Sequence, residues 1–286
     1  MASYLWQACY EGESVMTTGN RVKDTIWILS IIGAILLILP ILVLLYYGFV
    51  VYRSSAGFSN QVFESILLTL ITSAISAAVV FLLFTPLAYE LASSKHSGLE
   101  SISDIPASIP HPIVGIAFLI LGSPFTPTGR FLASIGISFF DSIQGIVVAL
   151  TFVSAPIYIR TMQSVFSSRK QDADLYTMSL GTSRIKMLYG AILPSLKRET
   201  LYAGLTSMSR GMSEFGSIAI LAYYVTQYPF AGVSNASVLI YNYYGYLGPG
   251  VAVSASALMI VVSIAVLAAA RLLGRVGNWR SLSGND

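Results

Sequence analysis

The sequence predicts an all-α membrane protein with about six transmembrane helices, and three observations support this fold class. The 286 residues are 55% hydrophobic and 10% charged, with a mean hydropathy of +0.73, whereas a soluble domain carries about 25% charged residues. Six apolar runs are each long enough, at ~20 residues, to cross ~30 Å of hydrocarbon. Lysine and arginine gather between alternate runs. Backbone groups in lipid must bond within their own segment, so we expect helices; barrel strands would be shorter and would alternate.

The six predicted spans are residues 25–52, 64–91, 105–121, 142–165, 200–225 and 250–273. Pro86 interrupts the second span, and Pro106, Pro110 and Pro112 stand at the opening of the third. Proline frees a backbone carbonyl and distorts a helix, which a membrane tolerates only within protein or beside a water-filled cavity. The three prolines of the third span therefore indicate either a pore-lining segment or a kinked helix entry.

The distribution of lysine and arginine sets the orientation of the spans. One side of the predicted membrane carries most of these residues: Arg21, Lys23, Lys95, the cluster within 160–198, Arg271, Arg275 and Arg280. The other side carries Arg53 and Arg130. Because positive residues favour the cytoplasmic side, we expect a multi-pass protein of the cell membrane with both termini in the cytoplasm. A single transmembrane domain, residues 25–274, would lie between cytoplasmic tails of residues 1–24 and 275–286.

Several kinds of chemistry are excluded by the residues. A net charge of +3 is too small to indicate nucleic acid, and one cysteine, Cys9, excludes a disulfide within the chain or a multi-cysteine metal site. Without a Gly-Lys pair there is no phosphate-binding loop for ATP, and the G-x-S-x-G and H-E-x-x-H motifs are also missing. His96 and His111 are far apart and lack neighbouring carboxylates, which favours polar roles at helix ends. We therefore expect no catalytic residue, metal site or cofactor in this chain.

The stretch between the fourth and fifth spans is polar yet periodic. Leu175 and Met178 share a helical face, and Gly181 permits the left-handed turn that ends many helices. An apolar stripe follows at helical spacing: Ile185, Leu188, Tyr189 and Ile192. Pro194 ends the pattern where the fifth span begins. The stretch predicts two short helices that meet at a glycine, with one apolar and one basic face. An amphipathic connector held on anionic lipid would show the same pattern.

The spacing within this stretch resembles the cytoplasmic EAA loop of the permease subunits of ABC importers. Gly181 is followed thirteen residues later by Pro194, as in that loop, and Leu193 precedes the proline. The family's Glu-Ala-Ala is replaced by Leu-Tyr-Thr at 175–177. The resemblance implies that residues 171–193 form a coupling helix that docks on an ATPase subunit. The residues assigned to this coupling are Asp174, Leu175, Met178, Gly181, Ser183, Arg184, Leu188 and Pro194.

Two further stretches narrow the resemblance. Residues 210–216, Arg-Gly-Met-Ser-Glu-Phe-Gly, are similar to the R-A-L-G-E-F-G stretch of molybdate, tungstate and sulfate permeases. Residues 104–115 are similar to the proline-rich opening of the third span in the same group. The resemblance implies a type I ABC permease that works as a homodimer and imports a tetrahedral oxyanion, tungstate or molybdate ahead of sulfate. An external binding protein would deliver the anion, and ATP and Mg²⁺ would bind to a partner ATPase dimer.

Two alternatives to this function stay open. The first is an ABC permease for another solute, such as phosphate. The second comes from a different class, a secondary transporter or channel driven by an ion gradient. That class usually shows an acidic relay within the membrane or an internal repeat, whereas Glu214 is the one acid well inside a predicted span.

Arg210 and Glu214 have two physical interpretations. Arg210 lies about ten residues, or ~15 Å, into the fifth span, where an unpaired arginine costs at least ~2.5–3.5 kcal/mol. Glu214 follows one helical turn later, within pairing reach. The pair either pins neighbouring helices or borders the translocation path, where a weak site would suit conduction. In the second case the path or its gate is lined by Arg210, Glu214, Phe215, Gly216, Pro106, Pro110 and Pro112.

Overall fold

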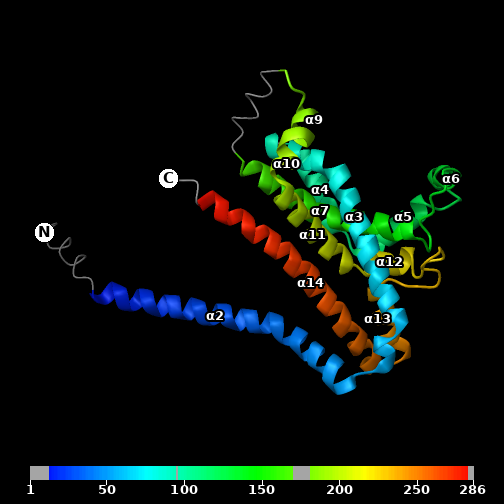
Figure 1. Ribbon diagram of the computed structural model, residues 1–286, viewed down its shortest axis with the longest axis horizontal. Coiled ribbons are helices and arrows are strands. Elements are labelled where there is room, and N and C mark those ends of the chain that lie inside the picture. Colours follow the sequence, from blue (N-terminus) through cyan, green and yellow to red (C-terminus); the bar gives the residue numbers. More distant parts are fainter. Residues whose placement is uncertain (1–12, 95, 170–180, 283–286) are drawn as a thin grey trace.

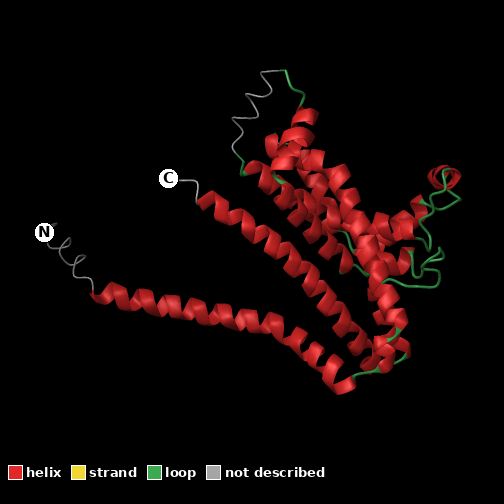
Figure 2. Cartoon of the chain, in the orientation of Figure 1, coloured by secondary structure: helices red, strands yellow, loops and turns green. Residues whose placement is uncertain are grey.

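The computed structural model describes residues 13–94, 96–169 and 181–282, and every regular element in these ranges is a helix (Figure 2). Within these ranges, four helices are long and apolar enough to cross a membrane. They are α2 (Glu13–Tyr46, continued by the π-helix η1, Tyr47–Tyr52), α3 (Asn60–Ser93), α7 (Ile143–Ser167) and α14 (Pro249–Leu282). They correspond to the predicted first, second, fourth and sixth spans and confirm the all-α membrane class.

The predicted third and fifth spans are each broken into two helices. The third consists of α4 (Ser97–Ser108) and α5 (His111–Leu121), which meet at an angle of 103°. The fifth consists of α11 (Lys197–Met212) and α12 (Gly216–Leu221), separated by residues 213–215. The helices therefore follow the order of the six predicted spans, but the third and fifth spans are not continuous helices.

Each break has a local cause. Pro110 disfavours the helical conformation of the residue before it, and Ile109 is extended, with φ −86° and ψ 134°. In the fifth span, the side chain of Glu214 accepts a hydrogen bond from the backbone N–H of Ser217 at 3.0 Å. This bond replaces the helical partner that the N–H group would find four residues earlier. A new helix therefore starts at Gly216.

The centre of the molecule is a bundle of α3, α7 and α11, with α14 packed on α11 (Figure 1). Buried hydroxyl side chains lie between these helices, among them Ser76, Thr151 and Ser207. Thr151 donates a hydrogen bond to Ser76 across the α3–α7 contact at 3.3 Å. Small polar residues let membrane helices approach closely. At the end of α7 nearest α4, Arg160 forms ion pairs with Glu100 and Asp104 and so holds α4 against the bundle.

Helix α2 contacts the rest of the chain near one end and then diverges from the bundle (Figure 1). The contact is tight: a Cβ atom on Gly48 of η1 would lie 2.5 Å from Cβ of Ala257 in α14. The Ser254 hydroxyl donates a hydrogen bond to the Gly48 carbonyl at 3.2 Å. Along the helix, apolar side chains such as Leu36 and Leu37 are 65% and 77% exposed. Within this single chain, α2 therefore presents an uncovered apolar surface.

Shorter helices close the two ends of the bundle. Helix α13 (Ala236–Tyr246) lies at one end, and α6 (Pro127–Ser134) follows α5. The opposite end carries α9 (Arg184–Met187), the π-helix η3 (Leu188–Ile192) and α10 (Leu193–Ser195) (Figure 1). The 3-10 helix η2 (Ser55–Phe58) joins η1 to α3. The described part of the segment predicted to be cytoplasmic thus lies at the end of the bundle opposite α13.

A buried carboxylate clamps the loop before α7 to the loop after α12. Asp141 is 6% exposed and has a left-handed backbone, with φ 46°. Its Oδ1 accepts a hydrogen bond from the backbone N–H of Tyr223 at 3.1 Å, and its carbonyl accepts one from the Thr226 hydroxyl at 2.9 Å. Asp141 also donates its own N–H to the Leu221 carbonyl. The clamp fixes the end of α12 relative to the start of α7.

Candidate functional site

The broken third and fifth spans meet at a cluster of three side chains, which we call the His111 cluster: His111, Arg210 and Glu214. His111 begins α5, and its Nδ1 lies 2.9 Å from Oε2 of Glu214. Its Nε2 lies 3.0 Å from a terminal nitrogen of Arg210, the last basic residue of α11. The expectation that His111 lacks a neighbouring carboxylate is wrong, because the carboxylate comes from a residue distant in sequence. His111 was missed even though it stands within the proline-rich stretch that the sequence singled out.

Glu214 is completely buried and its carboxylate is fully bonded. Oε1 accepts hydrogen bonds from the backbone N–H and the hydroxyl of Ser217, at 3.0 and 2.9 Å. Oε2 faces His111 and, at 3.5 Å, Arg210. The Ser237 hydroxyl of α13 donates to the Glu214 carbonyl at 2.7 Å. A buried charge held in this way is a structural anchor, so Glu214 fits the pinning interpretation.

Arg210 differs from Glu214 in its exposure. Its side chain is 24% exposed, and its contact with Glu214 is long for an ion pair, at 3.5 Å. One terminal nitrogen also donates to the Ser213 hydroxyl at 3.1 Å. A guanidinium offers five donors in a fixed plane and binds oxyanions well. The His111 side chain is also partly exposed, at 32%, but Arg210 has the larger number of donors to offer towards solvent.

Glycine and proline make the close approach of α5 and α12 possible. A Cβ atom on Gly216 would lie 2.9 Å from Cδ of Pro112, and one on Gly115 would lie 2.6 Å from the Ser217 carbonyl oxygen. The two motif stretches therefore contact each other in the fold. The three predicted prolines separate in role: Pro112 packs on Gly216, Pro110 sets the bend, and Pro106 lies inside α4 before the bend.

Phe215 points away from the cluster. Its side chain is 37% exposed, and its ring centroid lies 5.1 Å from that of Tyr241 in α13. Both rings line an open cavity of about 380 Å³, together with Tyr244, Val253 of α14 and Leu44 of α2. Phe215 thus borders accessible space beside the cluster, on the side of α13 and α14.

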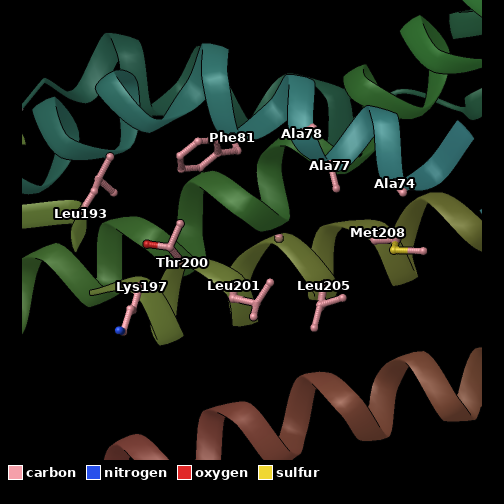
Figure 3. Close-up of a pocket in the computed structure, with 11 residues that line it drawn as sticks. Ala74, Ala77, Ala78, Phe81, Leu193, Lys197, Thr200, Leu201, Leu205 and Met208 are labelled. Carbon is pink, nitrogen blue, oxygen red and sulfur yellow. The ribbon is translucent and has the colours of Figure 1, made fainter. Parts of the chain in front are cut away.

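A larger cavity of about 560 Å³ lies between α3 and α11 (Figure 3). Its walls are apolar and include small residues such as Ala74, Ala77 and Gly204. Lys197 is its one charged lining residue, near the start of α11. No group of three or more metal-ligating side chains occurs within the described ranges. The 560 Å³ cavity thus offers packing surface rather than a polar binding site.

The predicted coupling residues lie partly within the described chain. Gly181 has the expected left-handed backbone, with φ +85°, and Ser183 caps α9 through its side chain. Arg184 lies 3.3 Å from Glu90 at the end of α3, and Glu90 lies at the same distance from His96. His96 therefore also has a carboxylate neighbour, contrary to expectation. Asp174, Leu175 and Met178 fall outside the described residues.

The apolar stripe of the coupling segment is only half right. Leu188 and Ile192 are buried, whereas Ile185 and Tyr189 are 72% and 41% exposed. From Leu188 to Ile192 the chain forms the π-helix η3, whose turn is wider than that of the α-helix that the spacing assumes, so Tyr189 departs from the stripe. Met187, which the stripe did not include, is buried instead.

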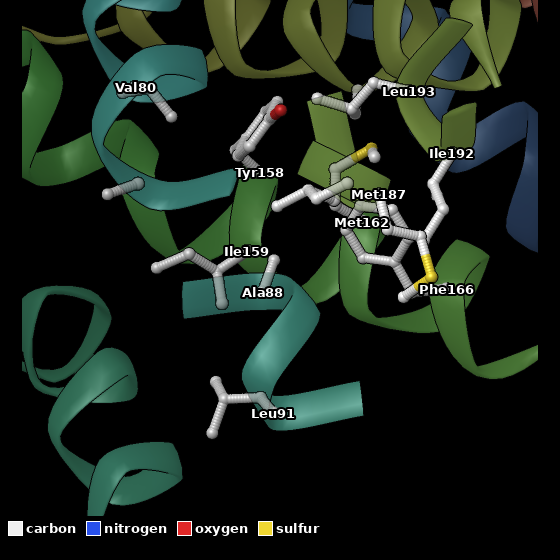
Figure 4. Close-up of a cluster of buried hydrophobic side chains, with 13 residues drawn as sticks. Val80, Ala88, Leu91, Tyr158, Ile159, Met162, Phe166, Met187, Ile192 and Leu193 are labelled. Carbon is white, nitrogen blue, oxygen red and sulfur yellow. The ribbon is translucent and has the colours of Figure 1, made fainter. Parts of the chain in front are cut away.

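The buried residues of the coupling segment join the core of the bundle (Figure 4). Met187, Leu188, Ile192 and Leu193 pack in one cluster with residues of α7 and α3. The α7 members include Tyr158, Met162 and Phe166, and the α3 members include Ala88 and Leu91. Pro194 itself is exposed, at the start of the short α10. The coupling segment is thus attached to two membrane-spanning helices.

Residues 86–276 match the family described as "binding-protein-dependent transport system inner membrane component". The chain belongs to this family. The matched range includes the His111 cluster and the described part of the coupling segment. It makes the chain a multi-pass membrane permease subunit.

Curated relatives cover most of the chain. The molybdate/tungstate transport system permease protein WtpB of Methanocaldococcus jannaschii is 28% identical over 76% of this chain and 84% of its own. The protein of the same name from Pyrococcus abyssi is 26% identical, with 87% and 95% covered. The sulfate transport system permease protein CysT of Synechocystis is 27% identical over 91% of both chains.

A solved structure confirms the fold. The MetNI methionine ABC transporter in an inward-facing conformation has a chain that matches with a TM-score of 0.52 and 19% identity. The match covers 76% of this chain and 94% of that chain. At this identity the likeness concerns architecture alone, and it supports the type I permease fold predicted from the sequence.

Proposed function

We propose that this chain is the membrane-spanning subunit of an ATP-driven importer of tetrahedral oxyanions, with tungstate or molybdate ahead of sulfate. The observation that carries the proposal is that relatives covering most of the chain are named for molybdate and tungstate or for sulfate. The partly exposed guanidinium of Arg210 within a broken membrane segment supports it, because guanidinium is a good oxyanion donor. Neighbouring Glu214 weakens the field, which favours passage over tight binding.

The chain would perform no bond chemistry of its own. ATP and Mg²⁺ would bind to a partner ATPase dimer, and closure of that dimer would move residues 171–193. Because Leu188 and Ile192 share a buried cluster with α3 and α7, motion of the coupling segment would be transmitted to the bundle. An external binding protein would deliver the anion to the opposite end. In this arrangement both termini of the chain are cytoplasmic.

A second copy of the chain and membrane lipid would cover the exposed apolar surfaces. The long uncovered surface of α2 supports this, since Leu36 and Leu37 are largely exposed within the described part of the chain. The polar composition of α11, from Lys197 to Met212, supports a path along that helix rather than contact with lipid. We therefore propose a homodimer that encloses the path between its two copies.

The decisive experiment is uptake into proteoliposomes that contain the chain, its ATPase and its binding protein. Tungstate or molybdate accumulation that requires both internal ATP and the binding protein is the expected result. Phosphate uptake in place of tungstate would support the permease alternative. Accumulation driven by an ion gradient without ATP would contradict the ABC function.

A further inference from the structure

We infer that His111 is a positioning residue that keeps the Arg210 guanidinium available to the passing oxyanion, an inference that rests on the proposed function. The sequence left open whether Arg210 and Glu214 neutralise each other or line the path. The contacts of His111 divide these roles between the two residues: Glu214 anchors the fold, and Arg210 faces the path.

The partners of His111 determine which of its ring nitrogens donates a hydrogen bond and which accepts one. Nδ1 lies 2.9 Å from Oε2 of the Glu214 carboxylate, whose oxygen accepts, so Nδ1 is the donor. The same terminal nitrogen of Arg210 lies 3.0 Å from Nε2 and 3.5 Å from Nδ1. Because a guanidinium can only donate, Nε2, the nearer nitrogen, is its acceptor. With Nδ1 donating to Glu214 and Nε2 accepting from Arg210, both contacts are satisfied at once.

The imidazole acts as a spacer between two opposite charges. Its Nδ1–H occupies Oε2 of Glu214, and its Nε2 holds a terminal nitrogen of Arg210. The closest direct approach of Arg210 to Glu214 is 3.5 Å, whereas charge-assisted hydrogen bonds are usually about 2.7–2.9 Å long. Without His111, the guanidinium would close this gap and form a tighter pair with the carboxylate. Its charge would then be neutralised and its donors withdrawn from the path.

The position of His111 also connects the two broken spans. It is the first residue of α5, directly after the 103° bend. One of its partners, Arg210, lies near the end of α11, and the other, Glu214, lies in the break between α11 and α12. The tight contact of Pro112 with Gly216 fixes the backbone beside it. The placement of Arg210 therefore depends on how α5 sits against α12.

Two variants each preserve one of the two hydrogen bonds of His111. In His111→Asn, the side-chain amide can take the place of Nδ1–H and still donate to Glu214, but it cannot reach Arg210. In His111→Gln, the longer side chain can place its carbonyl oxygen near the position of Nε2 and accept from Arg210. His96→Asn is the matched control, because His96 also faces a carboxylate but is half exposed.

The variants are compared in the reconstituted transporter with its ATPase and binding protein. We expect His111→Asn to lower the maximal rate of tungstate uptake about tenfold, the effect of losing one charge-assisted hydrogen bond. His111→Gln should stay within about threefold of the wild type, and His96→Asn should match it. Tm values of the purified complexes are measured in parallel. A structural role alone would lower uptake in proportion to Tm.

Reaction of Arg210 with phenylglyoxal, followed peptide by peptide by mass spectrometry, gives a readout independent of transport. In the wild type the reagent should modify Arg210, and tungstate should slow this modification. In His111→Asn the modification should be slower and insensitive to tungstate.

Equal loss of uptake in both histidine variants, or unchanged reactivity of Arg210 in His111→Asn, would overturn the role of His111. Failure of the wild type to take up tungstate would instead contradict the proposed function.

Discussion

Asp141 illustrates a charge that is kept at a cost to stability. It lies in the loop before α7, and burial raises the pKa of its carboxyl above the usual 3.8, although the backbone N–H groups of Tyr224 and Tyr223 oppose this shift. The residue supplies two other properties. Its side chain accepts the Tyr223 N–H, and its left-handed backbone, with φ 46°, is tolerated best by Gly, Asn and Asp.

Asp141→Asn should remove the cost of the charge and keep both properties. Because the pKa is raised in the folded state, the folded wild type holds its proton more tightly than the unfolded chain. Its stability therefore falls as pH rises from about 3.8 through the raised pKa, and stays lower above it. The Tm of Asp141→Asn relative to wild type should accordingly increase with pH across this window. Thermal unfolding in detergent between pH 4 and 8 measures it.

Asp141→Ala serves as the control, since alanine loses the acceptor and is strained at positive φ. It should be less stable than the wild type throughout the same pH range. A difference in Tm between Asp141→Asn and wild type that does not change with pH would show that the charge carries no cost.

At the scale of elements, the contact between α5 and α12 brings together two broken spans. Neither helix is long enough to cross the membrane, since α5 has 11 residues and α12 has 6. Their crossing is close because Gly216 and Gly115 present no side chain at the contact. In this respect glycine serves packing between helices rather than an unusual backbone conformation.

Gly216→Ala should destabilise this crossing. The added Cβ would lie 2.9 Å from Cδ of Pro112 and 3.2 Å from Cβ of His111, neither of which can move without shifting the start of α5. Overpacking of this kind costs about 1–3 kcal/mol. Gly98→Ala in α4 is the control, because nothing lies within 4 Å of a Cβ at that position. A lowered Tm for Gly216→Ala with an unchanged Tm for Gly98→Ala is expected; equal values would contradict the close crossing.

Hydropathy predicted the order of the spans because it depends on composition over ~20 residues. The breaks depend on single residues, and only one left a trace in the sequence: Pro110 predicts a distortion, although not an angle of 103°. The break near Glu214 was not predicted, because residues 200–225 read as one run. The contact of His111 with Arg210 joins positions 99 residues apart. A periodic pattern within one segment of the sequence cannot predict such a contact. The π-helix η3 was not predicted either, because the spacing of the apolar stripe assumes an α-helix.

At the scale of the whole molecule, the coupling segment presents a buried side and an exposed side to different neighbours. Leu188 is 3% exposed within the core shared with α3 and α7, while Ile185 is 72% exposed. In an assembled importer the exposed side would face the ATPase. Stability of the subunit and attachment of its partner should therefore be separable by mutation.

Ile185→Ser should reduce the amount of ATPase that co-purifies with the chain and leave its Tm unchanged. Leu188→Ala should lower the Tm, since truncation of a buried leucine costs about 2–5 kcal/mol. Deletion of residues 171–193 should abolish ATPase attachment altogether. Affinity purification followed by thermal unfolding of the separated subunit tests all three. Retention of the ATPase after the deletion would exclude this segment as its docking site.

The attachment of α2 has a consequence for the synthesis of the protein. Helix α2 is made early, yet the close contacts of Gly48, in the η1 turn that continues α2, are with Ala257 and Ser254 of α14, which is made much later. Between these events the ribosome must produce some two hundred residues, since Ser254 and Gly48 are 206 positions apart. Helix α2 therefore enters the bilayer before α14, the helix that its η1 continuation packs against, has been made. A nascent chain released before Pro249 would lack these contacts with α14.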